Sequence, residues 1–194
     1  MPTAHQKKSI YEPDQEGLHF PREPVFHTLA EERQHRRERL AAVCRIFGRY
    51  KFEYGFAGHV TVRDPEHHDL FWTNPFGMSF SRVRASDLIL VDHAGKVVEG
   101  TWAVNRAGFV LHSAIHEAHP DIVASCHAHT VNGMAWAALG RPLDPITQTA
   151  CGFYGHQAVI TEEAGAVVVE KGAGNSVANA FGNAKVAIHQ NHGL

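Results

Sequence analysis

The chain has 194 residues, 44% hydrophobic and 20% charged, which suits one soluble globular domain with a sizeable core. Its formal net charge of −2 excludes the strongly basic proteins that bind nucleic acid or anionic membrane surfaces. The three cysteines are odd in number and widely spaced, which argues against a disulfide framework. The sequence shows neither a signal-peptide pattern nor an apolar run of membrane-spanning length, so we expect a cytoplasmic protein.

The N-terminal part divides into an arm and a helix. Residues 1–23 are polar and contain three prolines, which is typical of a mobile arm, and we expect the folded domain to span residues 24–194. Thr28 and Glu31 form a capping-box pattern that predicts a helix start. The charged run 31–39 is expected to be the solvated face of this helix. Its buried face is predicted from apolar residues at helical spacing: Leu40, Val43, Cys44 and Phe47.

Short strands and helices alternate after this helix. The expected strands are 59–63, 70–73, 87–91, 97–100, 122–124, 157–161 and 186–190. The expected helices are 105–119, 131–139 and 174–183. Asp64, Pro65 and Glu66 predict a turn between the first two strands, with His67 and His68 exposed in it. This alternation indicates the α/β class, with antiparallel hairpins early in the chain.

The segment Cys126-His127-Ala128-His129-Thr130 carries the strongest chemical signal. It follows an apolar run that predicts a buried strand, and residues i and i+2 of a strand point to one face. His127 and His129 should therefore aim their imidazoles at one point, while Cys126 should point into the core. His192 offers a third imidazole near another strand end, and such a set can hold a divalent transition metal. The alternative is a pair of partly exposed histidines without a ligand.

A second set of histidines lies on the helix expected over residues 105–119. His112, His116 and His119 share one stripe of that helix. His112 and His116 could form an i, i+4 metal pair, but the segment lacks the glutamate of the metalloprotease motif. We therefore favour the site at the strand ends and expect His112 to line the pocket.

Five separated stretches, in order, resemble the class II aldolase and adducin head-domain family. The stretches are 58–65, 74–77, 107–112, the pair His127 and His129, and 190–194. Together they extend from about residue 25 to the last residue. The resemblance implies a three-layer α/β/α domain with a central mixed sheet flanked by helices.

The resemblance also implies a chemistry. Members of the family hold a divalent metal, usually Zn²⁺, on three histidines that match His127, His129 and His192 here. Fe²⁺ and Mn²⁺ are alternatives for this site. The metal acts as a Lewis acid on a small-molecule hydroxy- or keto-carbonyl substrate and stabilises an enediolate. Members are typically homotetramers with the site near a subunit interface.

Three departures from the family pattern affect the expected function. Gly108 stands where the phospho-sugar aldolases carry a glutamate acid/base. His59 and Arg106 stand near the positions that grip phosphate, so a carboxylate is as suitable an anion as a phosphate. The chain stops soon after His192, where family members continue, and we expect it to be truncated at its C-terminus.

The remaining candidate site residues follow from these matches. His59, Gly77, Arg106 and His112 are candidates for substrate binding. Tyr154 is a candidate acid/base, and the alternative is an aromatic side chain packed beside a glycine-rich loop.

Three functions remain open from the sequence. The first is a metal-dependent lyase of aldol type. The second is an Fe²⁺ oxygenase or oxidative decarboxylase, because three histidines without a carboxylate also suit iron, and a few family members in aminocoumarin antibiotic biosynthesis resemble such enzymes. The third is a non-catalytic assembly module like the adducin head domain, against which the retained histidines argue.

Overall fold

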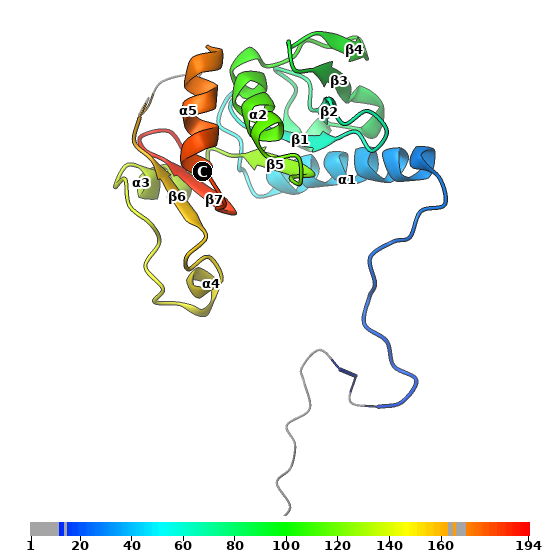
Figure 1. Cartoon of the computed structure of the whole chain (residues 1–194), viewed down its shortest axis with the longest axis horizontal. Coiled ribbons are helices and arrows are strands. Elements are labelled where there is room, and N and C mark those ends of the chain that lie inside the picture. The colour runs from blue at the N-terminus through cyan, green and yellow to red at the C-terminus, as the bar shows by residue number, and fades with distance from the viewer. Residues whose placement is uncertain (1–11, 14, 163–164, 166–169) are drawn as a thin grey trace, which may run out of the picture.

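The structure is a computed structural model that describes residues 12–13, 15–162, 165 and 170–194. The expected mobile arm over residues 1–23 lies mostly outside the described residues. Figure 1 shows the described part of this segment extending away from the rest of the chain. Within the described residues, no helix is both long enough and apolar enough to cross a membrane.

The strands found in the described part of the chain form two separate sheets. The larger sheet has the order β4-β3-β2-β1-β5 with antiparallel pairing throughout, and the smaller sheet is the parallel pair β6-β7. The strands of the larger sheet are β1 (His59–Arg63), β2 (Leu70–Thr73), β3 (Ile89–Asp92), β4 (Val97–Glu99) and β5 (Ala124–His127). Those of the smaller sheet are β6 (Gln157–Ile160) and β7 (Val186–His189).

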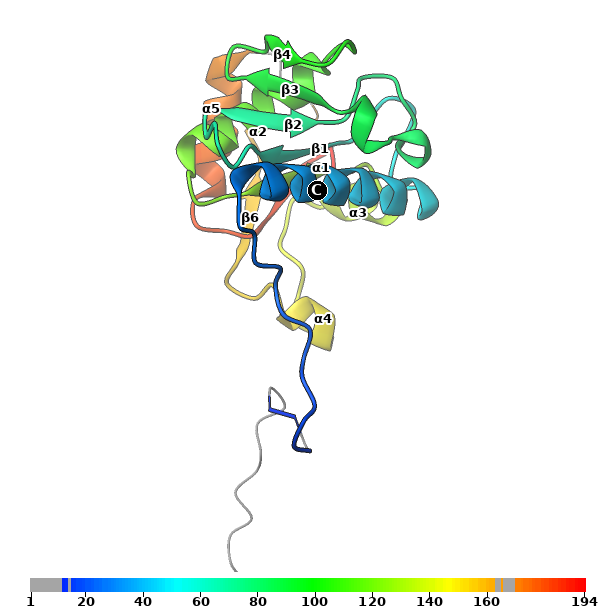
Figure 2. The ribbon, with the colours of Figure 1, turned by 90° about the vertical axis from the view of Figure 1, so that its right-hand side faces the viewer.

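Helices cover both faces of the larger sheet. The α-helices are α1 (Leu29–Arg49), α2 (Arg106–Ala118), α3 (Val131–Ala137), α4 (Gln148–Cys151) and α5 (Lys171–Phe181), with 3₁₀ turns η1 (Phe80–Arg82) and η2 (Ala85–Asp87). Figure 2 shows α1 nearest the viewer and α2 with α5 behind the strands. Side chains alternate accordingly, since Trp72 packs in the α1 core and Phe71 packs on the opposite face with Phe109 of α2. The α/β/α class is therefore confirmed, with the sheet divided in two.

Most expected elements are present, and the differences have local causes. The Thr28 capping box is formed, and Leu40 and Cys44 are buried as expected. The last helix begins at Lys171, three residues before the expected start at Gly174. Helix α4 and the two 3₁₀ turns were not predicted, because elements of one turn are too short to show a hydrophobic period.

The expectation that the charged run of α1 faces solvent is wrong for three of its arginines. Arg33 pairs with the buried Asp64, and Arg36 donates to the Arg63 carbonyl at 2.6 Å. The guanidinium of Arg37 lies 4.3 Å from the centre of the Trp72 ring. The long arginine side chains turn back to the sheet, where ion pairing and cation–π contact stabilise these partly buried side chains.

The expectation of a buried strand before His127 is also wrong. Ala124 and Cys126 are exposed, and only His127 of β5 is buried. The reason is that β5 is an edge strand. A cavity of about 960 Å³ lies between it and β7, so Cys126 faces open space rather than the core.

Asp64 joins α1 to the β1-β2 hairpin. Its carboxylate accepts hydrogen bonds from Arg33 Nε at 2.7 Å, Arg33 Nη2 at 2.9 Å and Trp72 Nε1 at 2.9 Å. The main-chain N–H groups of Glu66 and His67 donate to it at 2.9 Å each. Burial raises the pKa of Asp64, but these hydrogen bonds outweigh burial and lower the pKa to about 2.

We predict that Asp64→Asn lowers the free energy of unfolding at pH 7 by about 2 kcal/mol, because the amide loses the charge that pairs with Arg33. The folded-state pKa of Asp64 lies below the unfolded-state value. Its contribution is therefore complete above about pH 4 and disappears as pH falls towards about 2. Urea denaturation at steps across this range measures both the loss and its pH dependence.

The matched control is Asp69→Asn, because Asp69 is an exposed carboxylate in the same hairpin. It should change stability by less than about 0.5 kcal/mol. A gap between wild type and Asp64→Asn that is as wide at pH 2 as at pH 7 would contradict the assignment.

Candidate metal centre

The ends of β5 and β7 place three histidines side by side. His127 is the last residue of β5, and His129 follows it, with its main-chain N–H bonded to the Phe52 carbonyl at 3.2 Å. Thr130 then caps α3 by accepting from the Gly133 N–H at 2.9 Å. The backbone around the pair is thus fixed by bonds on both sides.

A tight loop positions His192. After β7 the chain reverses through Asn191, whose φ of 59° is left-handed, and His189 bridges to Gly193. The main-chain oxygen of Leu194 accepts from the Ala128 N–H at 3.1 Å and lies 2.8 Å from His127 Nδ1. These bonds join the loop after β7 to the end of β5.

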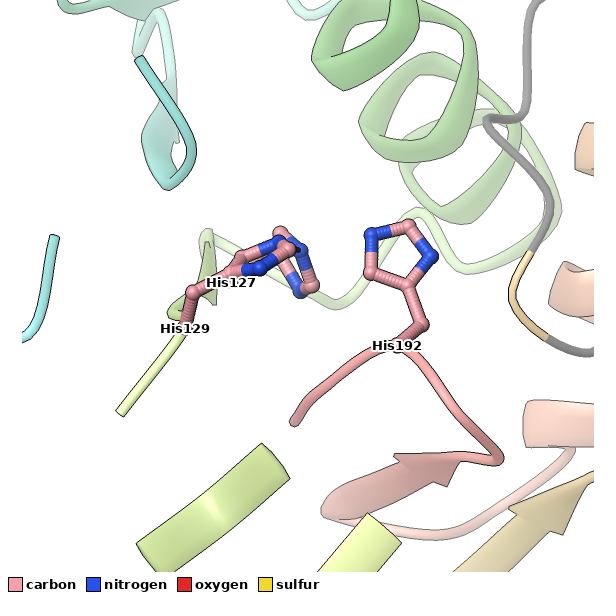
Figure 3. A group of neighbouring side chains, drawn as sticks. All are labelled: His127, His129 and His192. Atoms are coloured by element: carbon pink, nitrogen blue, oxygen red, sulfur yellow. Dashed lines mark hydrogen bonds between the residues drawn. The ribbon is translucent and has the colours of Figure 1, made fainter. Parts of the chain in front are cut away.

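The three imidazoles converge, as Figure 3 shows. One ring nitrogen from each of His127, His129 and His192 lies within 4.8 Å of the others. The ring centres are 4.6, 4.9 and 5.0 Å apart, and His127 Nε2 lies 2.8 Å from His129 Nε2. Among the described residues no carboxylate or thiol belongs to this cluster.

The protonation of His127 and His129 suits a metal ion. Burial, followed by the neighbouring histidines, lowers the pKa of His127 well below its usual value. Burial and then His192 lower the pKa of His129. The Leu194 oxygen can only accept, so His127 Nδ1 carries the proton and Nε2 presents its lone pair to the centre. Tetrahedral Zn–N bonds need nitrogens about 3.3 Å apart, so a separation of 2.8 Å requires a shift of about half an ångström.

Two expected substrate-binding histidines lie directly beside this cluster. His59 of β1 is paired with His127 of β5 in register, and their ring centres are 4.9 Å apart. His59 Nδ1 lies 2.9 Å from His112 Nε2, and both side chains are buried. Burial, then neighbouring histidines, lowers the pKa of each well below its usual value, so both rings are neutral.

The missing side chain at position 108 leaves room for the ring of His59. A Cβ atom added to Gly108 would overlap His59 Cδ2 and lie 2.7 Å from His59 Nε2. No side chain fits there while His59 keeps its position. The glycine that departs from the family pattern is therefore matched by an imidazole in the same space.

The other predicted site residues lie elsewhere. Arg106 is exposed and, together with Glu117 and Lys171, lines a cavity of about 480 Å³. The three histidines do not line this cavity. Gly77 adopts a φ of 78° in a turn beside Phe56. Tyr154 is 70% exposed, and no hydrogen bond or ring contact among the described residues joins it to the cluster.

The sequence analysis missed two residues that contact this region. His189 is buried and stacks on His192 with ring centres 4.7 Å apart. Thr61 is buried between His112 and His116, with its Oγ1 at 2.7 Å from the first and 2.9 Å from the second. The signal for Thr61 was the period of two along β1, which places residues 59, 61 and 63 on one face.

The comparisons with known proteins agree with this fold. Residues 38–194 match the model of the class II aldolase and adducin N-terminal domain. The chain belongs to this family. The match includes all three histidines of the cluster and every strand of both sheets.

Two curated relatives are named as a decarboxylase and as an oxygenase/synthase. The chain is 42% identical over 178 residues to the decarboxylase NovR of Streptomyces niveus, covering 91% of this chain and 66% of that protein. It is 41% identical over 178 residues to a 4-hydroxy-3-prenylphenylpyruvate oxygenase/4-hydroxy-3-prenylbenzoate synthase of Streptomyces roseochromogenus subsp. oscitans, covering 91% and 64%. The chain thus spans about two thirds of the length of these relatives.

A solved structure is named for a different reaction. The L-fuculose 1-phosphate aldolase of Glaciozyma antarctica PI12 superposes with a TM-score of 0.81 at 44% identity. The match covers 89% of this chain and 67% of that one. The relatives therefore agree on the fold and differ in the reaction for which they are named.

We predict that Gly108→Ala destabilises the protein by about 1–3 kcal/mol, because the added methyl group overlaps the His59 ring. This loss opposes the usual gain of up to about 1 kcal/mol from replacing glycine in a helix. Urea denaturation measures the change. The matched control is Gly172→Ala in α5, where nothing lies within 4 Å of the new Cβ atom.

The double variant His59→Ala/Gly108→Ala separates overlap from other causes. Removing the ring should make the second substitution neutral or stabilising. If Gly108→Ala is equally damaging with and without His59, the overlap is not its cause.

Proposed function

We propose that His127, His129 and His192 together bind one divalent metal ion and that the protein is a metal-dependent enzyme. The observation that carries this proposal is the convergence of three imidazoles from the ends of two separate sheets within 4.8 Å. Neutral imidazole is the form that ligates metals, and three protein ligands leave positions open for substrate. A bound ion would supply Lewis-acid chemistry or, as Fe²⁺, chemistry with dioxygen.

The residues around the centre prepare it for a substrate. The Leu194 oxygen holds His127 in the tautomer whose Nε2 lone pair faces the other two histidines. His127 and His112 also border the cavity of about 960 Å³, whose walls are largely apolar. The apolar lining includes Phe47, Phe52, Leu111, Ile115, Phe153 and Phe181. Such walls suit a small acid with an apolar portion.

The preferred reaction is oxidative decarboxylation of a small 2-oxo or 2-hydroxy acid with dioxygen and Fe²⁺. Two features support it over aldol cleavage. Position 108 has no carboxylate to act as acid/base, and the relatives named decarboxylase and oxygenase match 91% of this chain. All-histidine ligation is compatible with an Fe²⁺ centre that keeps open positions for dioxygen.

The second candidate is the aldol-type lyase with Zn²⁺, supported by the name of the similar aldolase structure. It needs another acid/base, and Tyr154, the candidate from the sequence, is exposed and has no hydrogen bond or ring contact with the cluster among the described residues. The third candidate is an assembly module like adducin. The retained histidine cluster argues against it.

The resemblance also motivates two structural proposals. We propose a domain that spans residues 24–194 and assembles as a homotetramer in the cytoplasm. Size-exclusion chromatography with light scattering tests the assembly, and limited proteolysis tests the boundary at residue 24.

We predict that the wild-type chain binds one divalent ion and that His192→Ala weakens binding by at least about 100-fold, because one of three ligands is lost. Elemental analysis and competition with a chelator measure stoichiometry and affinity. The matched control is His67→Ala, an exposed histidine in the β1-β2 turn. Metal binding by His192→Ala with the wild-type affinity would contradict the proposal that all three histidines bind the ion.

We predict oxygen-dependent turnover of 2-oxo acids with an apolar group by the Fe²⁺-loaded protein, with carbon dioxide released. An oxygen electrode and carbon dioxide trapping measure the two together. Cleavage of fuculose 1-phosphate should be slower than for an aldolase by about 10²–10⁴, since the acid/base carboxylate is absent. Efficient cleavage of that sugar phosphate without oxygen uptake would favour the lyase instead.

A further inference from the structure

A continuous hydrogen-bonded chain runs inward from the histidine cluster along β1 and α2. On β1, His59, Thr61 and Arg63 share one face because strand side chains alternate. On α2, His112 and His116 share one face because they are four residues apart. The five side chains interdigitate, and all of them are buried.

The far end of this chain fixes the direction of its hydrogen bonds. A guanidinium group has only donors, and Arg63 Nη2 lies 3.2 Å from His116 Nδ1. Arg63 is held there by the carbonyl oxygens of His68 at 2.6 Å, His116 at 2.7 Å and His119 at 3.2 Å, so Nη2 shares its two protons among three acceptors. A proton on His116 Nδ1 would point at this cation, so Nδ1 is the bare nitrogen and the proton of this neutral ring lies on Nε2.

The direction of this hydrogen bond fixes the donor and the acceptor in each of the next bonds. His116 Nε2–H donates to Thr61 Oγ1 at 2.9 Å. The single hydroxyl proton of Thr61 then goes to His112 Nδ1 at 2.7 Å, because the alternative acceptor, the Ser125 carbonyl, is at 3.4 Å. His112 in turn carries its proton on Nε2 and donates to His59 Nδ1 at 2.9 Å.

We propose that this chain holds His59 as a fixed donor, with its proton on Nε2, that hydrogen-bonds a substrate oxygen at the metal centre. Thr61, His112, His116 and Arg63 are positioning residues, which act only through His59. The role towards substrate rests on the proposed metal-dependent function, whereas the tautomers do not depend on it.

The location of His59 supports this assignment. Its Cδ2–Nε2 edge faces Gly108, since a Cβ atom at that position would overlap Cδ2 and lie 2.7 Å from Nε2. Its ring centre lies 4.9 Å from that of His127. The nitrogen that carries the proton therefore lies beside the empty side-chain position of Gly108. A fixed N–H there selects an oxygen with negative charge, such as a carboxylate or an enolate.

Nitrogen NMR of the metal-free full chain tests the tautomers directly. Long-range ¹H–¹⁵N correlations of ¹⁵N-histidine-labelled protein distinguish protonated from bare ring nitrogens, and single histidine replacements assign the peaks. We expect His59, His112 and His116 to be protonated on Nε2 alone. A proton on Nδ1 of His59 or His112, or rapid exchange between tautomers, would overturn the proposal.

Three variants test the direction of the chain. Thr61→Val removes the hydroxyl, so His112 and His59 should become mixtures of tautomers, whereas Thr61→Ser should keep the wild-type pattern. The matched control is Thr73→Val, which removes a buried hydroxyl that donates to the Val60 carbonyl at 3.0 Å outside this chain. If His112 and His59 keep their wild-type tautomers in Thr61→Val, the Thr61 hydroxyl does not fix them, and the proposal is refuted even if Thr61→Ser behaves as expected.

Oxalate, a small dicarboxylate, tests the contact with a ligand. We expect His59→Phe to bind oxalate about ten-fold or more weakly in the Zn²⁺-loaded protein, with unchanged zinc content, as measured by calorimetry. Equal oxalate affinity at equal zinc content would overturn the donor role. If the wild-type protein takes up no zinc, the proposed function and the donor role fail together, while the metal-free spectra still decide the tautomers.

Discussion

The candidate centre depends on the hydrogen bond between His127 Nδ1 and the main-chain oxygen of Leu194, at 2.8 Å. This bond and the Ala128–Leu194 bond beside it join the edge strand of the five-stranded sheet to the loop after the parallel pair. It also decides which nitrogen of His127 is bare. One contact therefore brings His192 to the cluster and orients His127 within it, so geometry and protonation have a common origin.

The rest of the site depends on polar groups that are buried yet satisfied. Imidazoles can be neutral, and each then offers one donor and one acceptor. A row of them can consequently cross a low-dielectric interior without an unpaired charge. Arg63 carries the charge in this row, and the carbonyls of His68 and His116 receive its protons. The buried Asp64 carboxylate is likewise satisfied, because five N–H groups donate hydrogen bonds to it. These bonds attach α1 to the hairpin that contains β1.

Positions 59 and 108 are coupled by the space that they share. A glycine in α2 and an imidazole on β1 occupy one volume, so the two positions constrain each other. A side chain at position 108 would have to displace the His59 ring, so a carboxylate cannot stand at position 108 while His59 keeps its place. The nearest titratable side chains to the histidine cluster from β1 and α2 are therefore neutral imidazoles rather than carboxylates.

The sequence by itself determined the fold class, most strands and helices, and the three histidines at strand ends, because period-two and helical patterns survive in single sequences. It also showed the absence of a carboxylate at Gly108. Only the tertiary structure decided that β5 is an edge strand with Cys126 exposed, that Arg33 turns inward to Asp64, and that Tyr154 is exposed. It alone placed His59 over Gly108, because which distant segments share a volume depends on packing between elements, and local periodicity carries no information about that.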